Sequence, residues 1–254
     1  MPGAPGALAG VRVMVTRPAH QAESLCRLIE AAGGTAVRLP LLTIEPASQP
    51  GDAERRLKAE GHGVPAHDTW IFTSANAARY AAPMIDRWPP RVVAIGLATA
   101  DALAIAGAAA SATPLSGSTS EDLLAMPEFA ALEGRRILIV TGEGGRDLLE
   151  QELAARGASV ARAAVYRRVP LPYPPETVAA SLRKTDIIVV TSGDALAHLV
   201  RLVPEGSRAS LVRKPLVVPS ARVVEKAREL GFAAPRLAAA VSDAALCAAC
   251  QQPA

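Results

Sequence analysis

The chain has 254 residues, 50% hydrophobic but only 3% aromatic, and its 27 basic and 24 acidic residues give a net charge of +3. This length is enough for two domains that each bury a core. Without a basic run or a set of aromatic stacking residues, the composition argues against nucleic acid as a partner.

The sequence shows neither a secretory leader nor a long apolar stretch free of charges, Pro and Gly. Its three cysteines do not make a disulfide framework. We therefore expect a soluble, cytoplasmic protein without a membrane partner.

Short β-branched runs bounded by polar or turn residues predict buried parallel strands. In chain order they cover residues 11–15, 71–72, 92–95, 137–140, 187–190 and 216–218. Amphipathic stretches between them predict helices at residues 21–32, 98–106, 146–156, 195–202 and 222–230. Four of these helices are followed by a glycine that can end them, namely Gly33, Gly107, Gly157 and Gly231. The alternation predicts an α/β fold with open sheets.

Several short motifs occur twice, in the same order and 118 to 125 residues apart. The pairs are Val15-Thr16 with Val140-Thr141, Thr73-Ser74 with Thr191-Ser192, Gly96 with Ser220, and Ser120-Glu121 with Ser242-Asp243. This repetition predicts two copies of one fold. Residues 39–46 and 163–170 are extended, proline-containing segments, which we expect to be the two crossings between domains.

Small hydroxyl residues or glycine follow several of the predicted strands, just before a helix. They lie in Thr16-Arg17-Pro18, Thr73-Ser74-Ala75-Asn76, Gly96 with Thr99, and Thr191-Ser192-Gly193. Taken singly, each is best interpreted as a helix N-cap. Taken together at one sheet edge, where open α/β sheets bind ligands and helix N-termini attract anions, they predict a cleft for carboxylates.

Other motifs argue against common cofactors. The run from Thr141 to Arg146 follows a strand but lacks the spacing of a nucleotide-binding loop, so we expect a tight turn, with Arg146 either structural or facing an acidic ligand. Cys247 and Cys250 have C-x-x-C spacing on a predicted helix, without further ligands, and are expected to be inert. Tyr166 is a polar aromatic in an apolar segment, either a weak acid or a half-buried strand residue.

Read together, these motifs resemble the uroporphyrinogen-III synthase family over residues 11–248. The resemblance rests on the order and spacing of Val15-Thr-Arg-Pro18, Gln21-Ala22, Leu39-Pro-Leu41, Ile44-Glu-Pro46, Phe72-Thr-Ser-Ala-Asn76, Ala94-Ile-Gly96, Thr99-Ala100, Gly142-Glu-Gly-Gly-Arg146, Val165-Tyr-Arg167, Val190-Thr-Ser192, Pro219-Ser220, Arg222 and Ser242-Asp243. Thr141 departs from bacterial relatives, which often carry Arg there.

The resemblance implies two flavodoxin-like domains with parallel sheets, joined by two extended connections. Residues 1–40 with 168–254 would form one domain, residues 41–167 an inserted second one, and the active-site cleft would lie between them. The sequence repeat and the folded domains would then not coincide.

It also implies a reaction, the closure of hydroxymethylbilane to uroporphyrinogen III and water with inversion of ring D, without metal or cofactor. Tyr166 falls on the family's proposed proton donor to the departing hydroxyl. The positions matching the family's cleft are Arg17, Ser74, Asn76, Gly96, Thr99, Arg146, Ser192, Ser220 and Arg222. We expect a monomer that meets hydroxymethylbilane synthase only transiently.

Two rival interpretations change the function, since a fold does not determine it. A non-catalytic tetrapyrrole-binding or regulatory protein on the same fold would usually carry an added DNA-binding or membrane segment. A nucleotide-sugar transferase with two α/β domains would need a clearer diphosphate loop and a catalytic His or carboxylate.

Overall fold

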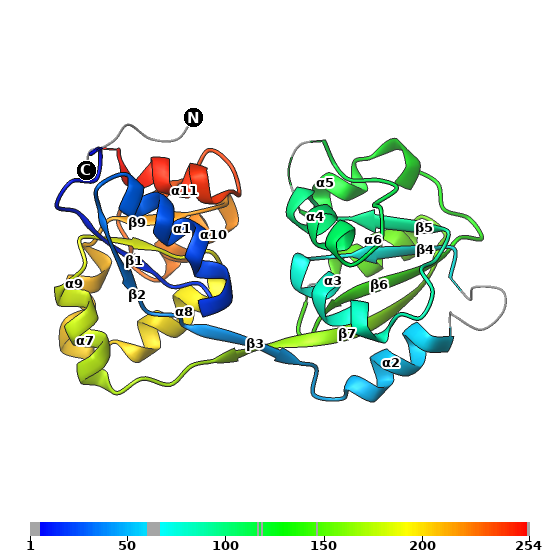
Figure 1. The fold of residues 1–254 in the computed structure, drawn as a ribbon, viewed down its shortest axis with the longest axis horizontal. Coiled ribbons are helices and arrows are strands. Elements are labelled where there is room, and N and C mark those ends of the chain that lie inside the picture. The colour runs from blue at the N-terminus through cyan, green and yellow to red at the C-terminus, as the bar shows by residue number, and fades with distance from the viewer. Residues whose placement is uncertain (1–5, 60–66, 116, 118, 146, 253–254) are drawn as a thin grey trace. The chain divides into compact units, whose positions relative to one another are not determined.

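The computed structural model describes residues 6–59, 67–115, 117, 119–145 and 147–252. The chain divides into two compact units, each a five-stranded sheet flanked by helices (Figure 1). Unit 1 combines Met1–Thr43 with Val169–Ala254, and unit 2 is Ile44–Arg168. The chain thus passes between the units twice, inside the two proline-containing segments.

The sheet of unit 1 is parallel, with the strand order β10-β9-β8-β1-β2. Its strands are β1 (Arg12–Val15), β2 (Thr35–Arg38), β8 (Ile187–Val189), β9 (Leu216–Val218) and β10 (Pro235–Leu237). Side chains alternate between its faces, so Val13 and Val15 join one core cluster and Met14 the other.

Helices cover the two faces of this sheet. Helices α1 (Ala19–Ala31) and α11 (Asp243–Cys250) pack on the Val13 side. The Met14 side is covered by α7 (Pro175–Arg183), α8 (Gly193–Leu202), α9 (Glu205–Val212) and α10 (Ala221–Glu229). Unit 1 therefore has a three-layer core with apolar side chains on both sides of the sheet.

Unit 2 has the strand order β3-β7-β6-β4-β5. The strands are β3 (Leu42–Pro46), β4 (Thr69–Phe72), β5 (Arg91–Ala94), β6 (Arg136–Gly142) and β7 (Ser159–Pro170). All but β3 are parallel. Hydrogen bonds from Ala47 N to Val165 O and from Leu171 N to Leu41 O show that β3 and β7 run in opposite directions.

Helices again cover both faces of the sheet of unit 2. One face packs against α2 (Pro50–Ala59), α3 (Ala75–Ala81) and α4 (Leu97–Ile105). The other packs against α5 (Ser120–Leu124) and α6 (Leu148–Ala155). Two short 3-10 turns, Ala82–Met84 and Pro127–Phe129, complete the described elements.

The strand orders confirm the predicted repeat. In both sheets the same sequence of four parallel strands appears, β9-β8-β1-β2 in unit 1 and β5-β4-β6-β7 in unit 2. A parallel bridge from Val93 to Ala112 lies beside β5, where unit 1 has β10. Paired motifs fall on matching elements, since Ser74 caps α3 as Ser192 caps α8, and Gly96 precedes α4 as Ser220 precedes α10.

The predicted α/β class is confirmed, and the predicted strands and helices are found with bounds shifted by at most two residues. The four glycines predicted to end helices all have positive φ, between 85° and 94°. The helix predicted from residue 146 is among the shifted ones, because it begins at Leu148 after Asp147. The elements missed at the sequence level are β2, β10, α2, α5, α7 and α9.

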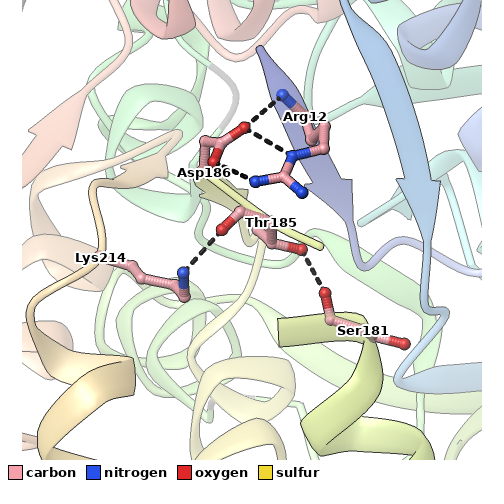
Figure 2. Close-up of polar contacts among 5 residues, drawn as sticks. All are labelled: Arg12, Ser181, Thr185, Asp186 and Lys214. Carbon is pink, nitrogen blue, oxygen red and sulfur yellow. Dashed lines mark hydrogen bonds and ion pairs between the residues drawn. The ribbon is translucent and has the colours of Figure 1, made fainter. Parts of the chain in front are cut away.

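Hydrogen bonds among polar side chains and the backbone connect the segments at the amino edge of the sheet of unit 1 (Figure 2). The Arg12 guanidinium donates to both carboxylate oxygens of Asp186, at 2.8 and 3.0 Å, which ties the start of β1 to the start of β8. Lys214 Nζ donates to Thr185 O at 2.6 Å, and Thr185 Oγ1 donates to Ser181 O at 2.7 Å. These groups satisfy each other and leave the opposite edge for ligands.

Candidate functional site

The carboxyl edge of the sheet of unit 2 gathers three strand ends. Phe72 pairs with both Val140 and Ala94, so the residues that follow these three positions lie at one edge. Thr73 Oγ1 donates to Thr141 Oγ1 at 2.8 Å across this edge. Thr141 is therefore a buried, hydrogen-bonded hydroxyl.

Ser74 connects this edge to a helix and to a phenol. Its Oγ accepts the backbone N–H of Ala77 at 3.0 Å, which makes Ser74 the N-cap of α3, as predicted. The same oxygen shares a hydrogen bond with Tyr166 Oη at 3.1 Å. The cap and the polar contact coexist because a hydroxyl has two acceptor lone pairs and one proton.

Tyr166 lies in β7 and is 1% exposed, so it is a strand tyrosine, as one alternative had it, but fully buried and not half-buried. The pairing of β6 with β7 shifts after Thr141, and this places Tyr166 opposite Gly142. A Cβ atom at residue 142 would lie 2.5 Å from the Tyr166 ring. The ring therefore fits only because residue 142 is glycine.

Arg168 is a member of this site that sequence reasoning missed. Its Nη2 donates to Tyr166 Oη at 2.9 Å, and its guanidinium carbon is 5.4 Å from the centroid of the Tyr166 ring. Residues i and i+2 of a strand share a face, and that spacing was the signal available in the sequence. Arg167 points to the other face, where it pairs with Glu45 at 2.9 Å.

The carboxyl edge of unit 1 has a different composition. Thr16 Oγ1 donates to Val189 O at 2.8 Å and so joins the ends of β1 and β8. Arg17 forms an ion pair with Asp243, the first residue of α11, and the two side chains are 19% and 20% exposed. Ser192 caps α8 by accepting from Ala195 N at 3.2 Å.

In the described part of the chain, several helices begin at these edges without a side-chain hydrogen bond to their first turn. Among them are α1 after Pro18, α4 after Gly96 and α10 after Ser220. The first N–H groups of a helix have no partner inside the helix, and they attract anions together with the helix dipole. Capping by a side chain was thus the right interpretation of Ser74 and Ser192, whereas Gly96 is the N-cap residue of α4 without a side-chain hydrogen bond.

The predicted site residues fall into one set in each unit. Unit 2 holds Ser74, Gly96 and Tyr166 at its carboxyl edge, with Asn76 in the first turn of α3 and Thr99 buried in α4. Unit 1 holds Arg17, Ser192 and Ser220, with Arg222 exposed in the first turn of α10. Arg146 lies outside the described residues.

The three cysteines do not belong to the carboxyl edge of either sheet. Cys26, Cys247 and Cys250 are buried free thiols in the α1–α11 side of unit 1. Burial raises the pKa of all three, that of Cys250 to about 12, which keeps them protonated and poor as nucleophiles. In the part of the chain that the structure describes, no three His, Cys, Asp or Glu side chains form a metal-binding group, and no helix could span a membrane.

The fold and these two edges define a two-unit α/β protein with hydroxyl groups and uncapped helix N-termini at the carboxyl edges of its sheets. A family model described as uroporphyrinogen-III synthase HemD matches residues 23–248. The chain belongs to the uroporphyrinogen-III synthase family. It is accordingly a lyase of the hydro-lyase class that acts in tetrapyrrole biosynthesis.

Curated relatives support the same assignment. The chain is 33% identical over 229 residues to the uroporphyrinogen-III synthase of Escherichia coli K12, covering 87% of this chain and 92% of that one. It is 34% identical over 229 residues, with the same coverage, to the uroporphyrinogen-III synthase of Salmonella typhimurium LT2.

Solved structures share the fold. A mutant uroporphyrinogen III synthase from the extremely thermophilic bacterium Thermus thermophilus superposes with a TM-score of 0.62 at 23% identity, covering 93% of this chain and 95% of that chain. Uroporphyrinogen-III synthetase from Helicobacter pylori 26695 gives a TM-score of 0.58 at 15% identity, covering 93% and 96%.

Proposed function

We propose that this chain closes hydroxymethylbilane, a linear tetrapyrrole with eight carboxylates, into uroporphyrinogen III with release of water. The identity of 33% to a curated synthase across 87% of the chain carries this proposal. Loss of the terminal hydroxyl leaves an electrophilic azafulvene. The substituted carbon of the far ring attacks it, and the resulting spiro intermediate breaks and recloses with ring D inverted.

The main task of the protein in this reaction is steering. Spontaneous closure gives the symmetric type I isomer, so the bound chain has to be held in the conformation that leads to the spiro intermediate. We infer that its carboxylates bind at the two carboxyl edges. The uncapped N-termini of α4 and α10, together with Arg17 and Arg222, supply the N–H groups and positive charge for this contact.

Ser192 at the start of α8, Asn76 in the first turn of α3 and Thr99 in the first turn of α4 complete the proposed contacts. Arg146 stays a proposed contact on its motif position alone. Hydroxide is a poor leaving group, so the first step needs a proton, and we assign this proton to Tyr166. Its hydrogen bond with Ser74 at the end of β4 supports the assignment.

The decisive experiment is an isomer analysis. Purified protein is incubated with hydroxymethylbilane, the products are oxidised to porphyrins, and the type I and type III isomers are separated and quantified. We expect mainly type III, formed faster than the type I that appears with heat-denatured protein. Type I alone, at the rate of the denatured control, would contradict the proposal.

We further propose that the chain works as a monomer and meets hydroxymethylbilane synthase only transiently. Light scattering after size exclusion should give the mass of one chain, with no stable complex when the two proteins are mixed. A stable dimer or a co-eluting complex would overturn this part of the proposal.

A further inference from the structure

We propose that Arg168 is a positioning residue for the general acid, and that it directs the Tyr166 proton to the substrate through Ser74. This inference rests on the proposed function and deepens it. Three groups are joined in one hydrogen-bonded chain, from Arg168 Nη2 to Tyr166 Oη at 2.9 Å and from Tyr166 Oη to Ser74 Oγ at 3.1 Å.

The groups in this hydrogen-bonded series differ in what they can donate. A guanidinium has only donors, so Tyr166 Oη must accept from Arg168. Ser74 Oγ donates to Tyr166 Oη in the structure, but hydroxyl protons rotate, so the same pair of oxygens can also carry the phenol proton to Ser74 Oγ. Ser74 Oγ also accepts from Ala77 N at 3.0 Å, and in the relay that we propose its own proton turns to the substrate as it receives the phenol proton.

Burial explains why the phenol needs an intermediary. Tyr166 is 1% exposed, its ring lies against Gly142, and the Tyr80 ring is 6.1 Å away between centroids. Ser74 is only half-buried, and it follows β4 at the carboxyl edge. A substrate at this edge can therefore contact Ser74 Oγ while Tyr166 stays enclosed behind it.

The proton transfers balance along this chain. When the C–O bond of the terminal hydroxymethyl group breaks, its electron pair stays on the oxygen, which takes the Ser74 proton and leaves as water. Ser74 takes the Tyr166 proton, and the phenolate stays beside the Arg168 cation. After ring closure, the proton that the ring carbon loses on regaining aromaticity returns through Ser74 to Tyr166, so no external acid, base or oxidant is consumed.

The neighbouring arginine provides a matched control. Arg167 and Arg168 are adjacent in β7 and both lie at the surface, but Arg167 faces Glu45 whereas Arg168 faces Tyr166. Replacing either by Gln removes one positive charge from the same strand. Only the replacement of Arg168 removes the donor to the phenol oxygen.

The experiment compares kcat and KM for type III formation, with thermal midpoints, in wild type, Arg168→Gln, Arg168→Lys, Arg167→Gln, Tyr166→Phe and the Tyr166→Phe/Arg168→Gln double variant. We expect Arg168→Gln to lower kcat roughly tenfold with KM within about twofold, at the low end of general acid effects. Arg168→Lys should recover part of the loss, and Arg167→Gln should stay near wild type. The double variant should be no slower than Tyr166→Phe alone, because Arg168 acts through Tyr166.

A separate set of variants tests the relay through Ser74. Ser74→Ala should lower kcat, while Ser74→Thr, which keeps a hydroxyl, should restore most of it. Thr119→Ala removes a comparable N-cap, that of α5, and should lower the thermal midpoint without lowering kcat. A loss of kcat in Ser74→Ala no larger than in Thr119→Ala would overturn the relay.

Several results would overturn the role of Arg168. A double variant slowed by the product of the two single effects would show that Arg168 acts independently of Tyr166. A change in KM alone would show that Arg168 contacts the substrate. Equal kcat and KM values in Arg168→Gln and Arg167→Gln would show that Arg168 does not position Tyr166. These outcomes are distinct from failure of the proposed function, in which the wild-type protein itself forms no type III product.

Discussion

The two units share one strand order but differ in the chemistry at their carboxyl edges. In both, a central strand ends in Val-Thr, at Val140-Thr141 in β6 and Val15-Thr16 at the end of β1. The next residue is Gly142 in unit 2, which leaves room for the Tyr166 ring. In unit 1 it is Arg17, which pairs with Asp243.

The difference between the two edges shows that two copies of one fold need not share a function. A glycine at the strand end permits a buried phenol with a serine and an arginine as neighbours, an arrangement that can move a proton. An arginine at the matching position offers a cation at a sheet edge, an arrangement that can hold a carboxylate. We therefore assign proton transfer to unit 2, and we assign Arg17 of unit 1 to binding.

The largest effect is expected from removing the phenol oxygen. Tyr166→Phe should slow type III formation by about ten- to a hundredfold, because the departing hydroxyl loses its acid. The loss of the hydroxyl's two hydrogen bonds should cost about 1–3 kcal/mol of stability. Timed assays with isomer analysis measure the rate of type III formation. The product should remain type III, diluted by type I from spontaneous closure.

Unchanged turnover in Tyr166→Phe would return this residue to a structural role. A variant of normal speed that forms mostly type I would instead show that Tyr166 steers the ring closure.

A smaller but related effect is expected at the position that distinguishes the two edges. Gly142→Ala places a Cβ atom 2.5 Å from the Tyr166 ring, so the ring must move. We expect a loss of about 1–3 kcal/mol in unfolding free energy, as for other overpacked cores, and a fall in kcat. Denaturant unfolding with parallel kinetics measures both.

Gly206→Ala is the control for this change, since a Cβ at that position in α9 would meet nothing within 4 Å. It should leave kcat unchanged and keep or raise stability. Equal stability losses in the two variants would refute the proposed fit of Tyr166 over Gly142.

In unit 1, a binding effect without a chemical effect is expected. Arg17→Gln removes the partly exposed cation beside α11 and should raise KM roughly fivefold, the effect of losing one contact between such a cation and a substrate carboxylate. The kcat value should stay close to that of wild type. A fall in kcat with unchanged KM would place Arg17 in the chemical step and would break the division between the units.

The smallest effect is expected at the amino edge of unit 1, away from either candidate site. Hydrogen bonds from Arg12 lower the pKa of Asp186, so this pair contributes stability above about pH 4 and loses it as the pH falls through the lowered pKa. Asp186→Asn should lower the thermal midpoint slightly near neutral pH, and this difference should shrink in acid as the pH falls through the lowered pKa. Because both side chains are exposed, salt should weaken the difference. An equal loss near neutral pH and in acid would show that packing, not charge, is responsible.

The fold was largely predictable because its signals are local. Buried β-branched runs such as Ile187–Val189 and glycines after helices depend on neighbouring residues. The strand β2 was missed because it lies at a sheet edge, where none of its side chains is fully buried and its sequence has no apolar run. Helices α2 and α9 were missed because they contain few large apolar residues, so no clear apolar stripe marks them.

The site was less predictable because it depends on pairing between distant strands. Tyr166 was found through the resemblance to a family, and its burial depends on the shifted register between β6 and β7. The Thr73–Thr141 bond joins residues 68 positions apart and requires that β4 pair with β6. Arg168 was overlooked because a surface arginine in a strand is ordinarily a solvated residue, and only the position of Tyr166 gives it a partner.

The most direct test of the division between the two units is the Tyr166→Phe/Arg17→Gln double variant, with kcat and KM for type III formation measured beside both single variants. We predict that kcat of the double variant equals that of Tyr166→Phe and that its KM equals that of Arg17→Gln. A kcat well below that of Tyr166→Phe would show that Arg17 takes part in the chemical step, which would contradict the assignment of proton transfer to unit 2 alone.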